Sequence, residues 1–126
     1  MPRSANLKKS SEFRVVYESG RRYDGLLMTA FVIPNRTSQH RLGITASRKV
    51  SRNAVGRNRV KRLLRESFRL SEADLKGLRQ PYDWVLNARG ALLGVKMAAP
   101  LDEFQKIVER VARDEREARL RDGCED

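Results

Sequence analysis

The sequence predicts an α/β (α+β) two-layer sandwich, in which helices pack against a small mixed sheet. At 126 residues, 40% of them hydrophobic, the chain is long enough for one core and too short for two. Its hydrophobic periodicity alternates between helical and strand patterns in the order α-β-β-α-β-α, which is typical of helices layered on a sheet. We therefore expect a single domain over residues 1–126, with mobile ends at residues 1–9 and about 115–126.

Positive charge dominates the composition and is concentrated in one stretch. The formal net charge is +11 and the pI is near 10.6, which favours nucleic acid or an anionic membrane surface as partner. Residues 41–69 carry a net charge of +9, whereas residues 1–40 contribute +4 and residues 70–126 contribute −2. The longest apolar run, Leu26–Ile33, is much shorter than the roughly 20 residues of a membrane span. We therefore expect nucleic acid, and no membrane, as the partner.

The cysteine content indicates a reducing compartment. Cys124 is the only cysteine and lies in a polar tail. A single thiol can form neither an internal disulfide nor a cysteine-based metal site. The first residues also lack the pattern of a secretory signal. These features predict a cytoplasmic protein.

The first half of the chain predicts one helix and two strands. Residues 10–20, SSEFRVVYESG, predict a short helix capped by one of its two leading serines. Leu26–Ile33 is rich in strand-forming residues and predicts a largely buried strand. Arg41–Ser47 alternates between apolar and small or polar residues, and predicts a second strand that forms a hairpin with the first.

The helix predicted over Asn53–Arg69, capped by Ser51 or Asn53, is the central feature of the sequence. Apolar residues recur on one of its faces at i, i+3, i+4 and i+8, and basic residues occupy the opposite face. Like charges at helical spacing repel one another, and a bound polyanion would offset this cost. Arginine, which dominates here, suits bidentate contact with phosphate. The sequence therefore predicts that this helix binds nucleic acid.

The rest of the chain predicts one more strand and one more helix. Residues 71–81 are expected to form a polar connection, followed by a third strand over Tyr82–Arg89 with Trp84 in the core. The last helix is expected to begin near Pro100. Beyond Ala112 the sequence has few apolar anchors, so we expect that helix to fray there.

No group of residues predicts an active site on the protein itself. No His, Cys or carboxylate cluster has the spacing of metal ligands or of an acid–base pair. His40 is interpreted as a surface residue, Asp83 as a strand-edge residue, and Asp102 and Glu103 as helix-start residues. We therefore predict no catalytic residue and no metal site in the chain.

Two aromatic residues of the first predicted helix have two possible roles. Phe13 and Tyr17 are four residues apart and share a helix face. An apolar stripe on a short helix usually packs into a core. Aromatic rings beside positive charge also form platforms on which single-stranded bases stack. Both readings remain open.

The segments RLGITASRKV (residues 41–50) and NAVGRNRVKRLLRESFR (residues 53–69) together resemble the protein subunits of bacterial ribonuclease P. The match consists of an alternating strand that ends in S-R-K, a short gap, and an R-N-R tripeptide at residues 57–59 within a basic helix. The aromatic pair of the first helix and the late strand WVLNARG also have counterparts in that family. The resemblance covers roughly Leu7–Val111, and the loop Ala91–Ala99 is variable in the family.

The resemblance implies a protein cofactor for a catalytic RNA. In this family the RNA subunit holds the Mg²⁺-dependent active site that hydrolyses precursor tRNA to give the mature 5′ end. The chain would thus belong to an endoribonuclease only as part of the holoenzyme, and would bind no cofactor alone. The protein subunit binds this RNA and holds the single-stranded 5′ leader in a cleft. The resemblance also implies a left-handed crossover between the second and third predicted strands, an exception to the usual hand.

The resemblance also assigns residues to these two tasks. The implied contacts to the RNA subunit are Arg48, Lys49, Arg52, Arg57, Asn58, Arg59, Lys61, Arg62, Arg65 and Arg69. The implied leader-binding residues are Phe13, Tyr17 and Phe31. A ribosomal protein-like rRNA-binding module is the alternative, because it would share the high charge and the sandwich. No DNA partner is expected, since no helix-turn-helix partner directly precedes the basic helix. An autonomous nuclease would cleave without RNA.

Overall fold

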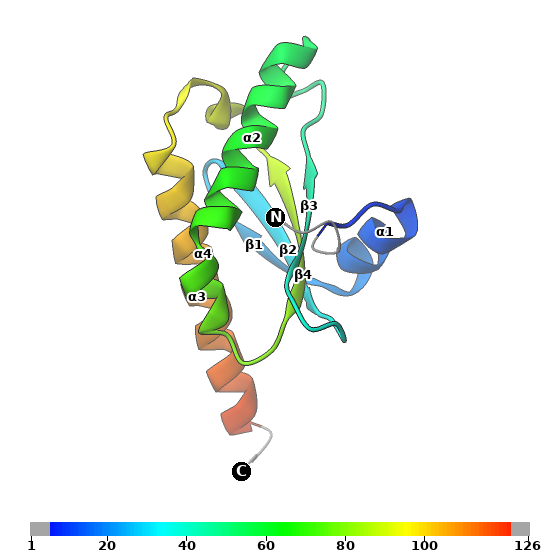
Figure 1. Ribbon diagram of the computed structural model, residues 1–126, viewed down its shortest axis with the longest axis vertical. Coiled ribbons are helices and arrows are strands. Elements are labelled where there is room, and N and C mark those ends of the chain that lie inside the picture. Colours follow the sequence, from blue (N-terminus) through cyan, green and yellow to red (C-terminus); the bar gives the residue numbers. More distant parts are fainter. Residues whose placement is uncertain (1–5, 122–126) are drawn as a thin grey trace.

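The structure, a computed structural model, describes residues 6–121 and consists of a four-stranded sheet with helices on both faces (Figure 1). The predicted mixed α+β fold is confirmed. None of the helices in this part of the chain is long and apolar enough to cross a membrane. In chain order the elements are α1 (Ser10–Ser19), β1 (Arg21–Asp24), β2 (Met28–Pro34), β3 (Arg41–Thr45), α2 (Ala54–Leu70), α3 (Glu72–Lys76), β4 (Tyr82–Ala88), the 3₁₀ helix η2 (Gly90–Gly94) and α4 (Ala98–Arg121).

The strand order is β1-β2-β4-β3, and this order corrects the predicted pairing. β2 and β3 do not form a hairpin, because β4 lies between them, antiparallel to β2 and parallel to β3. The hairpin partner of β2 is β1, a strand that the sequence did not predict. β3 and β4 are parallel neighbours joined through α2, as the implied crossover requires. The hand of that crossover stays a prediction.

The main core lies between the sheet and the pair α2 and α4, which run along the same face of the sheet (Figure 1). Trp84 of the central strand β4 is fully buried, as predicted. Its ring lies 5.4 Å from that of Phe104 on α4 and 6.5 Å from that of Phe68 on α2. Edge-on aromatic packing of this kind adds to the free energy gained by burying apolar area. The position of α2 relative to the sheet is therefore fixed by large side chains.

The central helix forms where the sequence predicted it. Asn53 is the N-cap, and its side chain accepts a hydrogen bond of 2.7 Å from the Gly56 N–H. Val60, Leu64 and Phe68 form the buried stripe. Since these residues face the sheet, the basic residues on the other side of α2 face solvent.

The start of the described chain is held in place, which corrects the expectation of mobility through residue 9. Leu7 is buried, and its N–H donates to the Leu42 carbonyl at 2.9 Å. The predicted serine cap of α1 is also wrong: Lys9 is the N-cap. The Glu12 carboxylate accepts hydrogen bonds from the N–H groups of Lys8 and Lys9, which lower the pKa of Glu12. Residues 1–5 of the predicted mobile segment lie outside the described residues.

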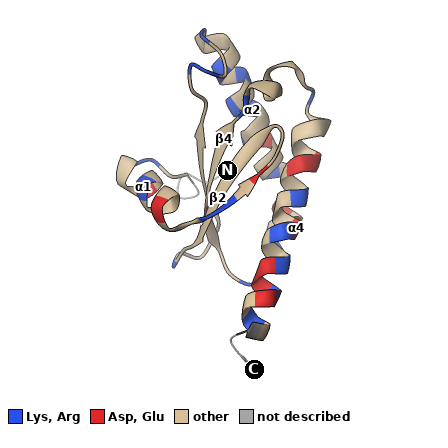
Figure 2. Cartoon of the chain, turned by 180° about the vertical axis from the view of Figure 1, so that it is seen from behind, with Lys and Arg blue, Asp and Glu red and all other residues tan. Residues whose placement is uncertain are grey.

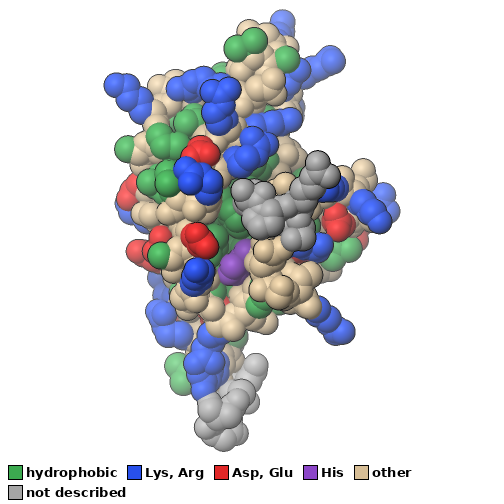
Figure 3. Space-filling model, viewed as in Figure 1, with side chains coloured by type: hydrophobic (Ala, Val, Ile, Leu, Met, Phe, Trp, Pro, Cys, Tyr) green, Lys and Arg blue, Asp and Glu red, His purple; other side chains and the backbone are tan. Residues whose placement is uncertain are grey.

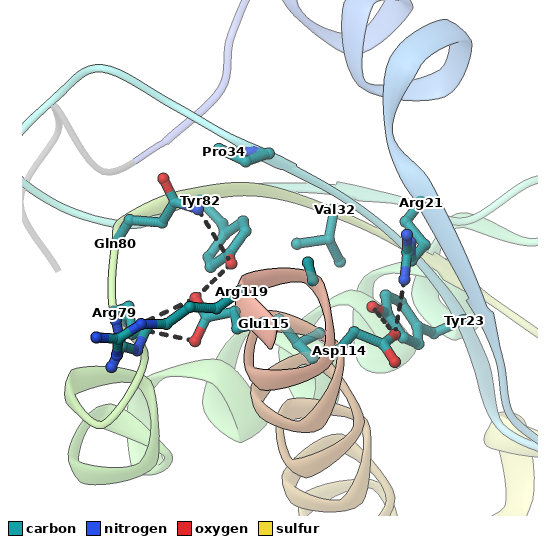
Figure 4. Close-up of a pocket in the computed structure, with 12 residues that line it drawn as sticks. Arg21, Tyr23, Val32, Pro34, Arg79, Gln80, Tyr82, Asp114, Glu115 and Arg119 are labelled. Atoms are coloured by element: carbon teal, nitrogen blue, oxygen red, sulfur yellow. Dashed lines mark hydrogen bonds and ion pairs between the residues drawn. The ribbon is translucent and has the colours of Figure 1, made fainter. Parts of the chain in front are cut away.

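The last helix does not fray beyond Ala112 as predicted, but continues to Arg121. The Tyr23 hydroxyl donates to Asp114 at 2.6 Å, and the Tyr82 hydroxyl donates to Glu115 (Figure 4). Two tyrosines of the sheet therefore anchor a helical segment that has few apolar residues of its own. Residues 122–126 lie outside the described residues. The predicted connection before β4 also contains a short helix, α3.

His40 is not a simple surface residue, because its ring connects three segments of the chain. Its Nδ1 accepts hydrogen bonds from the Tyr82 N–H and the Trp84 Nε1–H, both at 3.1 Å. Its Nε2 lies 3.0 Å from the Leu75 carbonyl and donates to it, since a carbonyl can only accept. The ring is therefore neutral, with its proton on Nε2, and burial lowers the pKa of His40.

Asp83 and Glu103, interpreted from the sequence as a strand-edge and a helix-start residue, also have structural partners. Asp83 is buried and pairs with Arg41 through two bonds of 2.7 and 2.6 Å. Asp83 also accepts a hydrogen bond from Asn35. Glu103 of α4 accepts hydrogen bonds from three successive backbone N–H groups, at residues 26–28. Asp102, by contrast, is an exposed helix-start residue, as predicted.

Candidate nucleic-acid interface

The basic surface, as we name it, consists of the loop between β3 and α2 and the solvent-facing side of α2. Blue basic side chains project from this end of the molecule in Figure 3. Several of these cations have side chains that form no hydrogen bond or ion pair with any residue that the structure describes. The charge of these side chains is therefore available to a ligand. They are Arg48, Lys49, Arg52, Lys61, Arg62 and Arg65.

The two arginines of the R-N-R tripeptide differ from this group. Arg57 donates through Nη1 to the carbonyls of Ser51 and Arg52, at 2.9 and 3.0 Å. These two bonds hold the loop between β3 and α2, which carries Arg48, Lys49 and Arg52. Arg59 donates through Nη1 to the Leu93 carbonyl at 2.8 Å and through Nη2 to the Val95 carbonyl at 2.9 Å. These bonds tie η2 and the residue after it to α2.

The other two predicted contacts of α2 are also exposed. Asn58 lies between the two arginines of the tripeptide and faces solvent. Arg69 pairs with Glu66 one turn earlier, with Nη2 and Oε1 2.6 Å apart, and this bond lowers the pKa of Glu66. The Arg69 charge is therefore partly neutralised within the helix. The cations without such a partner lie in the loop before α2 and at residues 61–65 of the helix.

A hollow of about 720 Å³ opens beside the start of α2. Four of its six lining residues are basic, and its walls come from the loop and the first turn of the helix. A site of this charge suits phosphate groups, which Arg and Lys bind by charge-assisted hydrogen bonds. Its lining residues are Arg48, Lys49, Val50, Ser51, Arg52 and Arg57.

The sheet has a second face, opposite α2 and α4, and α1 packs over part of it. Figure 2, drawn from behind, shows α1 on this side of the molecule. Val16 of α1 is fully buried there together with Leu7 and Val85 of β4. Phe13 packs against the same cluster and lies so close to Gly43 that a Cβ atom at Gly43 would be 2.5 Å from its ring. Phe13 therefore helps to hold α1 on the sheet, and its leader-binding role stays a prediction.

Tyr17 and Phe31 are brought together on this second face. Their ring centroids are 4.9 Å apart at an interplanar angle of 78°, and Tyr17 remains 38% exposed. The Arg22 guanidinium lies over the Phe31 ring, 5.7 Å from its centroid. Two of the three predicted platform residues thus form one aromatic cluster with a cation beside it. Arg22 was missed, because nothing in the sequence predicted β1.

A row of polar residues crosses the sheet next to this aromatic cluster. The register aligns Thr29, Asn87 and Thr45 on three adjacent strands. The hydroxyls of Tyr17 and Thr45 both donate to Asn87 Oδ1, at 2.8 and 2.7 Å. Sequence reasoning missed Asn87, although an Asn within the apolar run of β4 was a usable signal.

The described residues offer no metal site. Within residues 6–121, no group of three or more His, Cys, Asp or Glu side chains is placed to hold a metal ion. A second hollow, of about 500 Å³, lies far from the basic surface and is lined in part by the tyrosines and carboxylates that anchor α4 (Figure 4). Its carboxylates are engaged by those tyrosines.

The fold and the basic surface define a small α+β protein of the polyanion-binding class. Residues 1–112 match the sequence model of the family described as Ribonuclease P. The chain belongs to this family, and it is therefore a protein subunit of the ribonuclease P holoenzyme, which cleaves precursor tRNA. Its partner is the ribonuclease P RNA. The resemblance noted in the sequence is confirmed, and the ribosomal alternative is not supported.

Curated relatives agree with this assignment. The chain is 43% identical over 88 residues to the Ribonuclease P protein component of Clostridium kluyveri, covering 70% of this chain and 77% of the relative. It is 42% identical over 105 residues to the Ribonuclease P protein component of Methylococcus capsulatus, covering 83% of this chain and 79% of the relative.

Two solved structures show the same fold. The RNase P protein of Staphylococcus aureus superposes with a TM-score of 0.73 at 23% identity, over 85% of this chain and 94% of that protein. The RNase P protein of Thermotoga maritima also gives 0.73 at 23% identity, over 83% of this chain and 96% of that protein. At this identity the likeness concerns the fold alone.

Proposed function

We propose that the basic surface is the contact to the ribonuclease P RNA, and that the second face beside α1 holds the single-stranded 5′ leader of precursor tRNA. The protein contributes binding and positioning. Its described residues do not fit Mg²⁺, so we derive no catalytic step from the protein and assign the metal to the RNA subunit. We place this assembly in the cytoplasm, in keeping with a chain that has one cysteine.

The observation that carries the proposal is the group of cations whose side chains have no partner among residues 6–121. Holding like charges together on one helix and one loop destabilises the free protein. Neutralisation by RNA phosphates removes this repulsion and releases counterions from the RNA, which favours binding. The cations whose donors are engaged, such as Arg57 and Arg59, keep the loop and η2 in place beside them.

The leader assignment is supported by the aromatic cluster. Single-stranded nucleic acid binds to positively charged grooves in which aromatic rings stack on the bases. Tyr17 is partly exposed and rests against Phe31, so its ring is held in place while one part of it remains open to solvent. Arg22 supplies positive charge next to the rings. The rings and the basic surface belong to different elements, so the two tasks are separable by mutation.

Binding of the ribonuclease P RNA at several salt concentrations tests the RNA contact. Arg62→Ala and Arg65→Ala should each weaken binding and reduce the slope of log K against log salt by about one, the effect of one lost phosphate contact. Arg116→Ala is the matched control, because Arg116 is an exposed arginine of α4, away from the basic surface. Equal affinities and slopes for all three variants would refute the assignment of the basic surface.

Binding of the holoenzyme to precursor tRNA and to mature tRNA tests the leader contact. Tyr17→Ala should weaken binding of the holoenzyme to precursor tRNA by about 1 to 3 kcal/mol, the value of one stacked base, and leave binding of mature tRNA nearly unchanged. A thermal melt shows whether the variant remains folded. If Tyr17→Ala binds both tRNAs equally less well, and melts well below the parent, Tyr17 belongs to the core instead.

A further inference from the structure

We propose that Asn87 reads one base of the leader by donating a hydrogen bond to a keto oxygen, and that Tyr17 and Thr45 orient its amide for this purpose. The inference rests on the proposed leader-binding role of the second face. It goes beyond that role because it names a specificity-determining residue and the chemistry of the base that it prefers.

The structure orients the Asn87 amide with its oxygen toward two hydroxyl groups. Asn87 Oδ1 accepts two hydrogen bonds, from the Tyr17 hydroxyl at 2.8 Å and from Thr45 Oγ1 at 2.7 Å. A carbonyl oxygen has two lone pairs, so both are engaged. The Nδ2 group forms no hydrogen bond with any other residue in the described part of the chain. Asn87 is only half-buried, so its two N–H donors are open to a ligand.

An amide held in this way can form hydrogen bonds with fewer base edges than a free amide. Asparagine usually recognises adenine by donating and accepting at the same time. With Oδ1 engaged, Asn87 can only donate. Guanine O6 and uracil O4 are acceptors, whereas adenine N6 and cytosine N4 are donors at the corresponding positions. Where the amide meets the base at this position, the geometry favours a keto base, which accepts a hydrogen bond there, over an amino base, which can only donate.

The place of Asn87 on the sheet makes this contact reachable. The Tyr17 side chain that donates to Asn87 is the one whose ring packs against Phe31. A base stacked on the exposed part of the Tyr17 ring lies beside the amide, and its polar edge is available because a single strand is unpaired. Tyr17 thus combines stacking, which every base can satisfy, with the positioning of a group that distinguishes among bases.

The experiment measures binding of the reconstituted holoenzyme to precursors whose leader nucleotides are changed one at a time. At one position, uridine should bind about threefold to tenfold more tightly than cytidine, and guanosine more tightly than adenosine, as expected for one net hydrogen bond. Asn87→Val should abolish this preference. Tyr17→Phe, which keeps the ring and removes the hydroxyl, should reduce the preference while the precursor still binds more tightly than mature tRNA.

The outcomes separate this inference from the proposed function. If Asn87→Val and Tyr17→Phe keep the preference of the parent, or the parent has no preference at any position, Asn87 does not read a base. If Tyr17→Ala fails to weaken precursor binding, the leader assignment itself is wrong. A thermal melt of each variant comes first. Should Asn87→Val unfold, Tyr17→Phe and Thr45→Val provide the same test, since each removes one hydroxyl that orients the amide.

Discussion

His40 should couple the stability of the protein to pH, because a half-buried, neutral imidazole bonds to buried residues of the sheet. Its Nδ1 accepts hydrogen bonds from the Tyr82 N–H and the Trp84 Nε1–H. Protonation of Nδ1 would place a hydrogen atom opposite two donors, and both bonds would be lost. Burial lowers the pKa of His40, although the Leu75 carbonyl and Glu115 act in the opposite direction.

The sign and the size of the effect follow from linkage. Because the pKa of His40 is lower in the folded than in the unfolded chain, the unfolded chain binds more protons as the pH falls, and the free energy of unfolding decreases. The stabilisation is fully present above the ordinary pKa of 6.5 and is lost below it. Each unit of pKa difference is worth about 1.4 kcal/mol, so the loss at pH 5 has a ceiling of about 2 kcal/mol. Two donors left without partners would cost about 1 to 3 kcal/mol each. We therefore expect a loss at pH 5 of about 1 to 2 kcal/mol.

Urea unfolding at pH 7.5 and pH 5, followed by Trp84 fluorescence, measures this loss. His40→Asn is the control, because its Oδ1 can occupy the place of Nδ1 as an acceptor that does not titrate. His40 is the only histidine in the sequence, so the difference between parent and variant isolates its titration. An equal pH dependence for the two proteins would refute the reasoning.

Two further predictions concern the packing of the fold. Glu103→Gln should lower the free energy of unfolding by about 2 kcal/mol, because an amide cannot accept all three backbone N–H groups that the carboxylate binds. Asp102→Asn, at the exposed neighbouring position, should change the free energy of unfolding by less than about 0.5 kcal/mol in the same urea titration. Gly43→Ala should lower the free energy of unfolding by about 1 to 3 kcal/mol, because the new carbon displaces Phe13. Gly90→Ala should be nearly neutral, because its new carbon meets no atom within 4 Å. Equal melting temperatures for the two glycine variants would contradict the close packing of α1 on β3.

The central helix was predictable because several local signals agree in it. The cap at Asn53, the buried spacing of Val60, Leu64 and Phe68, and the basic opposite face all lie within one continuous segment. Periodicity and capping report on local structure, and α2 depends on little else for its limits. The charge that points to RNA lies in the same segment, so the main functional surface was also visible in the sequence.

The strand pairing was not predictable, because it depends on residues far apart in the chain. The short turn between β2 and β3 is of the kind that joins a hairpin, yet β4 enters between the two strands from some 40 residues further along. β1 has only four residues, of which Tyr23 alone is buried, so it shows no clear alternation. The wrong hairpin and the missed strand have the same cause: tertiary packing, and not the local sequence pattern, decides where these strands form and pair.

Several polar residues acquire their roles only through distant partners. His40 bonds to residues of β4 and α3, and Asp83 pairs with Arg41 across two strands. In the sequence neither belongs to a cluster of titratable residues, so nothing near it predicts its partners. Burial of such a group is tolerated only when hydrogen bonds replace its hydration, and these partners are set by the fold. Their roles are therefore visible only in the three-dimensional structure.

The R-N-R tripeptide shows how structure refines a reading based on charge. Charge alone does not distinguish Arg57 and Arg59 from Arg62 and Arg65, since all four are basic residues of one helix. In the structure the first two donate to backbone carbonyls of the preceding loop and of the η2 segment. Replacing either would remove a charge and also release a segment, the loop before α2 for Arg57 and η2 for Arg59. A weaker complex would then have two causes. The side chains of Arg62 and Arg65 bond to no described residue. Their replacement therefore reports on the RNA contact itself, and these two arginines are the better probes of it.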